Sequence, residues 1–287
     1  MMNARLLFVH ALSPLHAGTG QGVGVIDLPV AREKATGLPY LPGSSLKGVL
    51  RDACEDNEMR KKVFGPDTSR ADEHAGSVQI SDQRILLLPV RSLKGTFAWV
   101  TSPYILRRLI RDVEYVEVSD TPSDVPVPAS ISYCLVSDVR CKIEENNRVI
   151  LEDLDLIAKA SNNVREWAEW LGGQLFPDDQ TWQEMVTARF CVVHDDVMSF
   201  LLDTATEVFA RVRLHECTKT VEEGGLWYEE ALPTETILAG LVVATPVKAE
   251  PKEVFETIRK LIEKPLQLGG KATVGRGLCR LRMTGGN

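Results

Sequence analysis

We predict an α+β fold for this chain of 287 residues. Two observations support the prediction. Both ends of the chain show a strand, a helix and another strand in succession, and the segments between them are irregular, with no short-period repeat. This pattern is compatible with a ferredoxin-like (split βαβ) sheet that carries insertions. The length suits one large domain or two fused halves and is ample for a buried core.

The first half begins with an apolar strand over 4–12, and a turn-rich stretch follows it. From residue 44 to residue 57, apolar side chains keep helical spacing, and serines stand at the cap position. Residues 78–90 and 96–101 are predicted strands. Residues 102–113 are a predicted helix with proline in its first turn.

The second half is harder to interpret, because Pro122, Pro126 and Pro128 mark a loop and GGQLFPDDQ marks another. Its predicted elements are a helix over 150–171, a strand over 189–194, a helix over 195–203, a strand over 207–215, a strand over 237–244, a helix over 251–264 and a strand over 277–283. A long polar excursion separates the strands 207–215 and 237–244.

Composition limits the classes of function. The chain is 44% hydrophobic and 25% charged, which is typical of a soluble globular protein. No apolar run approaches the ~20 residues that cross a bilayer, and His10 interrupts the N-terminal apolar stretch, so we expect a cytoplasmic protein without signal peptide or membrane partner. The net charge of −7 argues against indiscriminate nucleic-acid binding and leaves room for one confined basic groove. Six scattered cysteines without a C-x-x-C pair predict buried thiols and disfavour a zinc knuckle.

A first candidate binding segment is LPYLPGSSLKGVLRDA, residues 38–53. The first backbone N–H groups of a helix have no partner inside it, and together with the helix dipole and two hydroxyls they favour a phosphate. Two basic side chains four residues apart share the neighbouring face. A capped helix with solvated basic residues is the alternative. The candidate contacts are Ser44, Ser45, Lys47, Gly48 and Arg51.

A second candidate segment is QLGGKATVGRGLCRLRM, residues 267–283. Four glycines and two cationic side chains stand in the nine residues from Gly269 to Gly277. Such a loop exposes backbone N–H groups to phosphates, although a tight turn explains it equally well. It matches neither the nucleotide phosphate loop nor a dinucleotide fingerprint.

A third candidate segment is the strand 207–215 with the excursion that follows. Apolar and basic side chains alternate along the strand, so one face is apolar and the other, with Arg211 and Arg213, is basic. A basic sheet face suits an RNA backbone. The excursion carries Lys219, Trp227 and Tyr228 among glutamates, so a long hairpin with aromatics near its end either wedges between bases or packs on its own protein.

Taken together, these segments resemble a known family. GSSLKG-x-x-R and GGKATVGRG resemble the paired motifs of the RAMP superfamily of CRISPR proteins. The opening S-P-L-H-x-G-x-G-x-x-x-G-V-I-D, residues 13–27, and KTVEEGGLWYEEALP resemble the multi-copy backbone subunit of the Cmr (type III-B) effector complex. The resemblance covers both ends of the chain and adds little in the middle.

The resemblance implies a single RAMP domain over 1–287: an RRM-like palm, helical fingers and a β-hairpin thumb. The palm would take in 4–12, 207–215, 237–244 and 277–283, the fingers and insertions about 52–200, and the thumb about 216–236. The implied partners are CRISPR guide RNA, complementary single-stranded target RNA, further copies of the chain and other Cmr subunits. The implied guide contacts are the candidate residues of helix 44–57, with Lys271, Thr273 and Arg276 of the C-terminal loop.

The resemblance also implies an endoribonuclease that cuts bound target RNA at regular intervals. The family's cleavage residue is an aspartate in the loop after the first strand, where Asp27 stands, and His16 lies in the same loop. RNA cleavage needs no protein nucleophile, because the 2′-hydroxyl attacks the adjacent phosphate once it is held in line. Asp27 would exchange a proton or bind a divalent metal, with Mg²⁺ or Mn²⁺ expected. Tyr228, Glu229 and Glu230 match the thumb segment that the family places near the scissile phosphate.

Three alternatives stay open at this point. A guide-processing endoribonuclease of the same superfamily would rely on a histidine or an acid–base cluster. A structural RNA-binding subunit without activity would need no Asp27. An unrelated enzyme for a small phosphorylated ligand would need further acid–base residues, and the sequence offers no convincing set.

Overall fold

The computed structural model describes residues 3–18, 26–66, 74–116 and 118–285. Its described helices are α1 (Gly43–Ala53), α2 (Asn57–Phe64), α3 (Pro103–Val113), α4 (Asn162–Leu175), α5 (Gln180–Arg189), α6 (Asp195–Thr204) and α7 (Pro251–Leu261). Its described strands are β1 (Asn3–Ala11), β2 (Tyr40–Leu41), β3 (Val78–Ile80), β4 (Gln83–Arg91), β5 (Phe97–Thr101), β6 (Tyr133–Ser137), β7 (Arg148–Leu151), β8 (Leu154–Ser161), β9 (Phe190–Val193), β10 (Glu207–Leu214), β11 (Val221–Ala231), β12 (Ile237–Ala244), β13 (Leu266–Gln267) and β14 (Leu278–Thr284).

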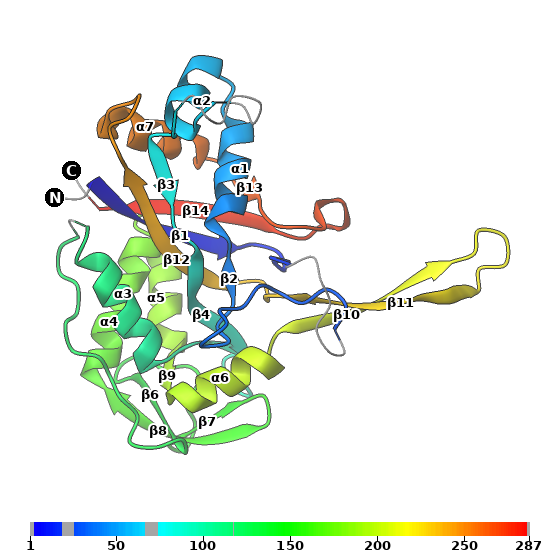
Figure 1. Cartoon of the computed structure of the whole chain (residues 1–287). Helices are drawn as coiled ribbons and strands as arrows, with labels where there is room; N and C mark the ends of the chain where they lie inside the picture. Colours follow the sequence, from blue (N-terminus) through cyan, green and yellow to red (C-terminus); the bar gives the residue numbers. More distant parts are fainter. Residues whose placement is uncertain (1–2, 19–25, 67–73, 117, 286–287) are drawn as a thin grey trace.

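The two ends of the chain build one antiparallel sheet, the palm (Figure 1). β1 lies between β12 and β14, and β12 continues to β3 and β4. α1 follows β1, and α7 connects β12 to β14. The order β14-β1-β12-β4 with two helices is the ferredoxin-like arrangement, so the predicted fold class is confirmed.

β1 is the centre of the palm and is buried over most of its length. A strand with covered faces on both sides reads as a nearly continuous apolar run, which ARLLFVHA does. α7 begins with proline at its first position and a capping box between Glu250 and Glu253. These local signals explain why the ends of the chain were predictable.

α1 packs tightly against β3, and its first residue must be small. A Cβ on Gly43 would lie 2.2 Å from the carbonyl oxygen of Ile80. The N-cap is Pro42, so the serines lie inside the first turn, and their prediction as caps was wrong. The side chain of Asp82 replaces them, because its Oδ1 accepts the Gly43 N–H at 2.9 Å.

The fingers extend the same sheet through β5, β9, β6, β8 and β7. The helix predicted over 150–171 is wrong in its first half, since β7 and β8 form a hairpin there and α4 starts only at Asn162. Apolar spacing around this turn fits a helix equally well. The turn position with a positive φ of 49° is occupied by Glu152, whereas a glycine there would have indicated a turn. α4 continues to Leu175, so the first four residues of the predicted GGQLFPDDQ loop are helical and that part of the prediction was wrong. α5 was missed, since no element was predicted between this loop and the strand at 189.

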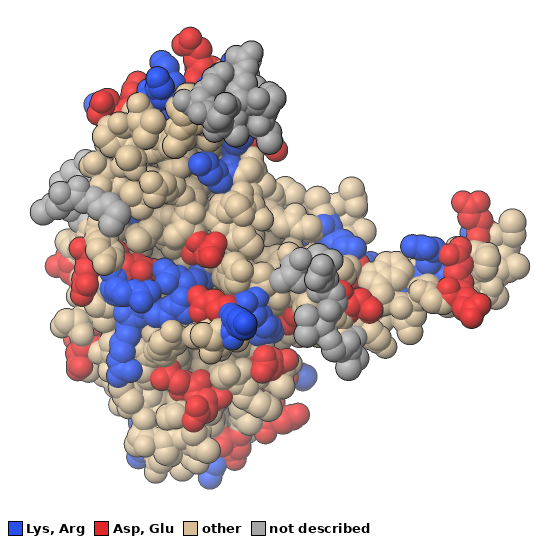
Figure 2. Space-filling view, viewed as in Figure 1, with Lys and Arg blue, Asp and Glu red and all other residues tan. Residues whose placement is uncertain are grey.

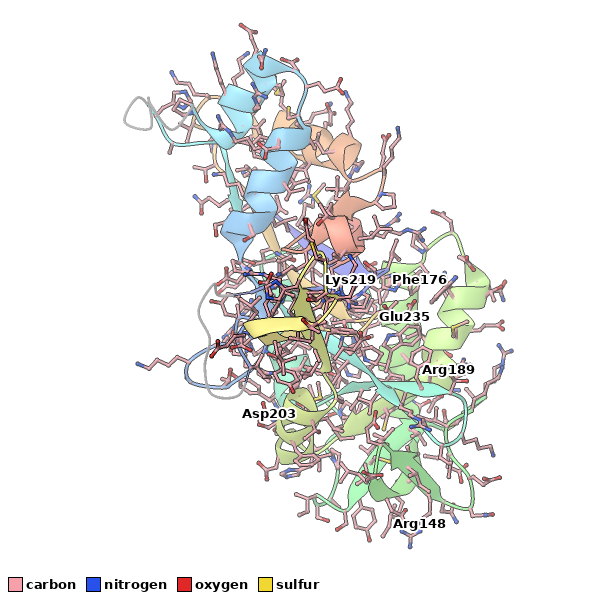
Figure 3. The ribbon with its side chains drawn as sticks, turned by 90° about the vertical axis from the view of Figure 1, so that its right-hand side faces the viewer. Arg148, Phe176, Arg189, Asp203, Lys219 and Glu235 are labelled. Atoms are coloured by element: carbon pink, nitrogen blue, oxygen red, sulfur yellow. The ribbon has the colours of Figure 1, made fainter. Side chains whose placement is uncertain are left out.

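The thumb is a separate two-stranded sheet of β10 and β11 that projects from the body (Figure 1). The strand predicted over 207–215 therefore belongs to the thumb, and its assignment to the palm was wrong. Figure 3 looks along this hairpin, with Lys219 at its tip and Asp203 on α6 below. Cys217 is exposed near the tip, so the prediction that all six cysteines are buried was also wrong. Among the described residues, no helix is long and apolar enough to span a membrane.

Candidate functional site

Asp27 is exposed and is bonded to the thumb. Its Oδ2 accepts the backbone N–H of Tyr228 at 2.8 Å. The loop that carries it closes on itself where the Ala31 N–H meets the Ala17 carbonyl at 2.7 Å. Residues 19–25, the glycine-rich part of the opening motif, lie outside the described residues.

The residues after Asp27 add a short third strand to the thumb. The Leu28 N–H donates to the Tyr228 carbonyl at 3.1 Å, and the Glu230 N–H donates to the Leu28 carbonyl at 3.0 Å. Leu28 forms a parallel bridge with Glu229. Backbone hydrogen bonds thus fix the position of Asp27 to β11, about 200 residues further along the chain.

Glu230 is buried between the thumb and this loop. Its Oε2 accepts the Val30 N–H at 2.9 Å, and its Oε1 accepts an N–H of Arg32 at 2.7 Å. Arg32 also donates to the Leu202 carbonyl at 2.9 Å and lies 3.3 Å from the Asp203 carboxylate. Both carboxylate oxygens of Glu230 are therefore directed at the loop.

Glu229 is buried on the other side of β11. Lys271 and the Trp227 indole N–H each donate to Oε1 at 2.8 Å, and Arg211 lies 3.3 Å from Oε2. Burial by itself would raise the pKa of this carboxyl, but the bonds from Lys271 and Trp227 and the charge of Lys271 outweigh it and lower the pKa to about 2. A carboxylate with so low a pKa is a weak proton acceptor near neutrality.

His16 is buried beneath the same site. Its Nδ1 lies 2.6 Å from the Glu230 carbonyl, and because a carbonyl only accepts, Nδ1 carries the proton. The Gly270 N–H donates to the His16 carbonyl at 2.9 Å, and a Cβ on Gly269 would lie 2.4 Å from that oxygen. This histidine joins the opening loop, the thumb and the C-terminal loop, whose glycines allow the close approach.

The C-terminal loop packs against the base of the thumb. Lys271 bonds to Glu229, and the Arg276 guanidinium lies 3.7 Å from the centre of the Phe209 ring and 4.0 Å from Glu207. Burial raises the pKa of Glu207, and the charge of Arg276 acts in the opposite direction. Two of the candidate guide contacts are thus engaged with the thumb in the free chain, while Thr273 is exposed.

The candidate contacts on α1 form a separate group. Ser44, Ser45 and Gly48 are exposed, and among the described residues outside this helix no atom lies within 4 Å of a Cβ built on Gly48. Lys47 donates to the Val78 carbonyl at 3.1 Å, and burial, followed by the charge of Arg51, lowers its pKa. Arg51 donates to the Gly65 carbonyl at 2.6 Å.

The thumb has two unlike faces. The polar face carries Phe209, Arg211, Trp227 and Glu229, and the C-terminal loop covers it near the body. The apolar face carries the buried Glu230 at its base. Beyond Glu230 it carries six exposed residues: Val208, Ala210, Val212, Leu214, Leu226 and Tyr228.

Charged and aromatic side chains lie elsewhere on the thumb than predicted. Residues 215–220, which form the tip around Lys219, include no Phe, Tyr or Trp, and Trp227 lies nearer the body. Arg213 is 3.9 Å from Glu222, so the basic face that was predicted is balanced by acids of its own hairpin. Figure 2 shows Asp and Glu gathered toward the far end of the thumb, and a larger group of Lys and Arg on the body.

The structure thus brings together His16, Asp27, Tyr228, Glu229, Glu230 and Lys271 at the base of the thumb, whereas the α1 group stands apart. Arg32 was not among the candidates. Its partner Glu230 is 198 residues away in sequence, and only its presence in the same loop as Asp27 pointed to it. Among the described residues, no group of three or more His, Cys, Asp or Glu side chains is placed to hold a metal ion.

Comparison with known proteins identifies the family and supports the fold. The model of the RAMP superfamily matches residues 8–280. The chain is 38% identical to the CRISPR system Cmr endoribonuclease Cmr4 of Pyrococcus furiosus, over 98% of this chain and 96% of the relative. Its fold matches oligomeric Cmr4 from Pyrococcus furiosus with a TM-score of 0.79 and 30% identity, covering all of both chains. A Type III-B Cmr-beta structure shares the fold at a TM-score of 0.74 and 22% identity, over 98% of this chain and 96% of that one. The chain therefore belongs to the RAMP superfamily.

Proposed function

We propose that this protein is the backbone subunit of a type III-B CRISPR effector complex, an endoribonuclease that binds guide RNA and cuts complementary target RNA at regular intervals. The observation that carries the proposal is the exposed Asp27 carboxylate, held by the Tyr228 N–H at the base of a projecting hairpin. The 38% identity to a protein named Cmr endoribonuclease supports it over nearly the full chain.

The reaction asks little of the protein beyond geometry and charge. The 2′-hydroxyl of a target nucleotide attacks the adjacent 3′-phosphate, and Asp27 accepts the hydroxyl proton. The bond from phosphorus to the 5′-oxygen of the next nucleotide breaks, which leaves a 2′,3′-cyclic phosphate and a 5′-hydroxyl that takes its proton from water. The N–H of Tyr228 orients Oδ2 of the carboxylate, and in this proposal Oδ1 faces the RNA. Tyr228 presents an exposed side chain beside it. The backbone and the charged side chains around Asp27 are held in place by His16, Glu229 and Glu230.

Metal dependence is a second part of the proposal. The described residues form no preassembled cage for a cation, so Mg²⁺ or Mn²⁺ would take one ligand from Asp27 and the others from RNA phosphate and water. Bound there, the ion would neutralise charge on the phosphate. The free chain should consequently bind the metal weakly.

Guide binding is proposed for the exposed groups of α1 and the C-terminal loop. Ser44, Ser45 and Gly48 leave the first turns of α1 open to a phosphate backbone, and Thr273 is open on the opposite loop. Positive charge comes from four side chains that contacts within the protein already hold in place: Lys47, Arg51, Lys271 and Arg276. Such contacts are indifferent to sequence, and base pairing with the guide would select the target.

Assembly with further copies and with other Cmr subunits is proposed from the thumb. An exposed apolar face on a projecting hairpin is uncommon in a monomer and is typical of an interaction surface. A relative with 30% identity is described as oligomeric. We expect this assembly to form in the cytoplasm.

The test is target-RNA cleavage by a reconstituted guide complex that contains either the wild-type chain or Asp27→Asn, with and without EDTA. We expect the variant to lose at least 100-fold in cleavage rate while guide and target binding stay unchanged. Asp153→Asn, an exposed carboxylate on the β7–β8 turn, is the matched control and should cut normally. Undiminished cutting by Asp27→Asn would instead make the chain an inert RNA scaffold. Cutting that survives EDTA would remove the metal from the proposal.

A further inference from the structure

A buried carboxylate at the base of the thumb faces the loop that carries Asp27 and has almost no exposure of its own. The Glu230 side chain is 3% exposed. Its two oxygens meet the Val30 N–H at 2.9 Å and the Arg32 guanidinium at 2.7 Å. The carboxylate therefore has no oxygen to offer to RNA.

We infer that the Glu230–Arg32 pair is a positioning device, which sets where the Asp27 carboxylate stands relative to the thumb. The inference rests on the proposed function and adds two positioning residues to it. Glu230 thus acts through the loop and does not touch the reacting atoms.

The contacts form one continuous chain from the thumb to Asp27. Residues 28 and 30 each bond to β11 or its side chains, and Asp27 bonds to the Tyr228 N–H. At the other end of this segment, the Arg32 guanidinium donates a hydrogen bond to Glu230. A catalytic group must be held to within about half an ångström of its productive place, and buried pairs with fixed geometry provide such support.

Arg32 also fixes the thumb to the body. One of its nitrogens donates to both Glu230 and the Leu202 carbonyl, and another lies 3.3 Å from Asp203 on α6. Figure 3 places Asp203 directly below the thumb. One guanidinium thus joins the Asp27 loop, β11 and α6, so a tilt of the thumb on RNA would be passed to Asp27 through the same contacts.

Stability alone is a weak reason for this pair. Buried ion pairs are often no more stabilising than apolar side chains of similar size, because desolvation offsets the attraction. A role in placing Asp27 explains why a fork-shaped guanidinium meets a carboxylate here.

The experiment compares wild type, Glu230→Gln, Arg32→Gln, Arg32→Lys and the Glu230→Gln/Arg32→Gln double variant in reconstituted guide complexes. Single-turnover cleavage rates, KM and target affinity are measured from pH 5.5 to pH 8.5. Asp112→Asn is the matched control, because it breaks a comparably buried pair with Arg84, outside the contacts between loop and thumb.

We expect Glu230→Gln and Arg32→Gln each to lower the cleavage rate about 100-fold with target affinity unchanged. The double variant should lose no more than the worse single variant, because the two side chains act as a unit. Arg32→Lys keeps the charge and should recover part of the rate, and the shape of the pH profile should not change. Asp112→Asn should cut normally even if its melting temperature falls.

Three outcomes would overturn the inference. Normal cleavage by Glu230→Gln would show that the pair does not place Asp27. Loss of one limb of the pH profile would make Glu230 a proton carrier that touches the reaction. A fall in target affinity equal to the fall in rate would make the pair part of RNA binding. Each of these is distinct from failure of the proposed function, in which Asp27→Asn itself cuts at the wild-type rate.

Discussion

The two faces of the thumb reverse the usual distribution of polar and apolar side chains. The polar face is covered near the body, where Glu229 meets Lys271 and Arg276 stacks on Phe209. The apolar face is open, with Val212 50% and Leu226 52% exposed. The charges near the body therefore hold the hairpin to its own protein, whereas we propose that the apolar side chains bind a partner. Charge alone is a poor guide to which face binds.

The largest expected effect is on the polar face. Glu229→Gln should lower the free energy of unfolding by about 3 kcal/mol at neutral pH, because Lys271 and Arg211 lose the charge that pairs with them. Urea unfolding of the isolated chain measures this. A loss below about 1 kcal/mol would mean that the pairing contributes little and that the two faces differ less than their burial suggests.

The same carboxylate predicts a pH dependence. The pKa of Glu229 is about 2 in the folded chain against an ordinary value of 4.5, so its stabilisation is complete above pH 4.5 and is lost as the pH falls toward 2. The full contribution is on the order of 3 kcal/mol. The difference in unfolding free energy between wild type and Glu229→Gln should therefore shrink as the pH falls from 5 to 3. A difference that stays constant would contradict the pairing.

A smaller effect is expected from the cation on the same face. Arg276→Gln should cost about 1 kcal/mol, because it removes a guanidinium that stacks on Phe209 at 3.7 Å. Lys252→Gln on α7, which removes a cation exposed to solvent, is the control and should stay within about 0.5 kcal/mol. Equal effects of the two changes would show that the stacking adds nothing to stability.

The smallest effect on stability is expected on the apolar face. The double change Val212→Ser/Leu226→Ser should alter the unfolding free energy of the isolated chain by no more than about 0.5 kcal/mol, because both side chains are half exposed. Sedimentation of the guide complex should at the same time show weaker assembly. Unchanged assembly would mean that the apolar face has no partner among these subunits.

Much of the palm was predictable because its signals are local. The apolar run of β1, the amphipathic α1 and α7 with its N-terminal proline each follow from a few neighbouring residues. The β7–β8 hairpin was not predictable, since its turn at Glu152 lacks glycine and its apolar spacing also fits a helix. The assignment of 207–215 to the palm failed for a similar reason, because alternation predicts a strand and says nothing about its partner.

For the candidate site, the residue types that are available could be read from the motifs alone. The motifs indicated Asp27 and His16 in one loop, and Tyr228, Glu229 and Glu230 in one thumb segment. Only the tertiary structure decided how these groups differ: Asp27 is open, whereas the two glutamates are buried, one against Lys271 and the other against Arg32. The physical reason is that burial and charge pairing depend on contacts between residues some 40 to 200 positions apart, as the Glu229–Lys271 and Glu230–Arg32 pairs are, and no local pattern of side chains encodes them.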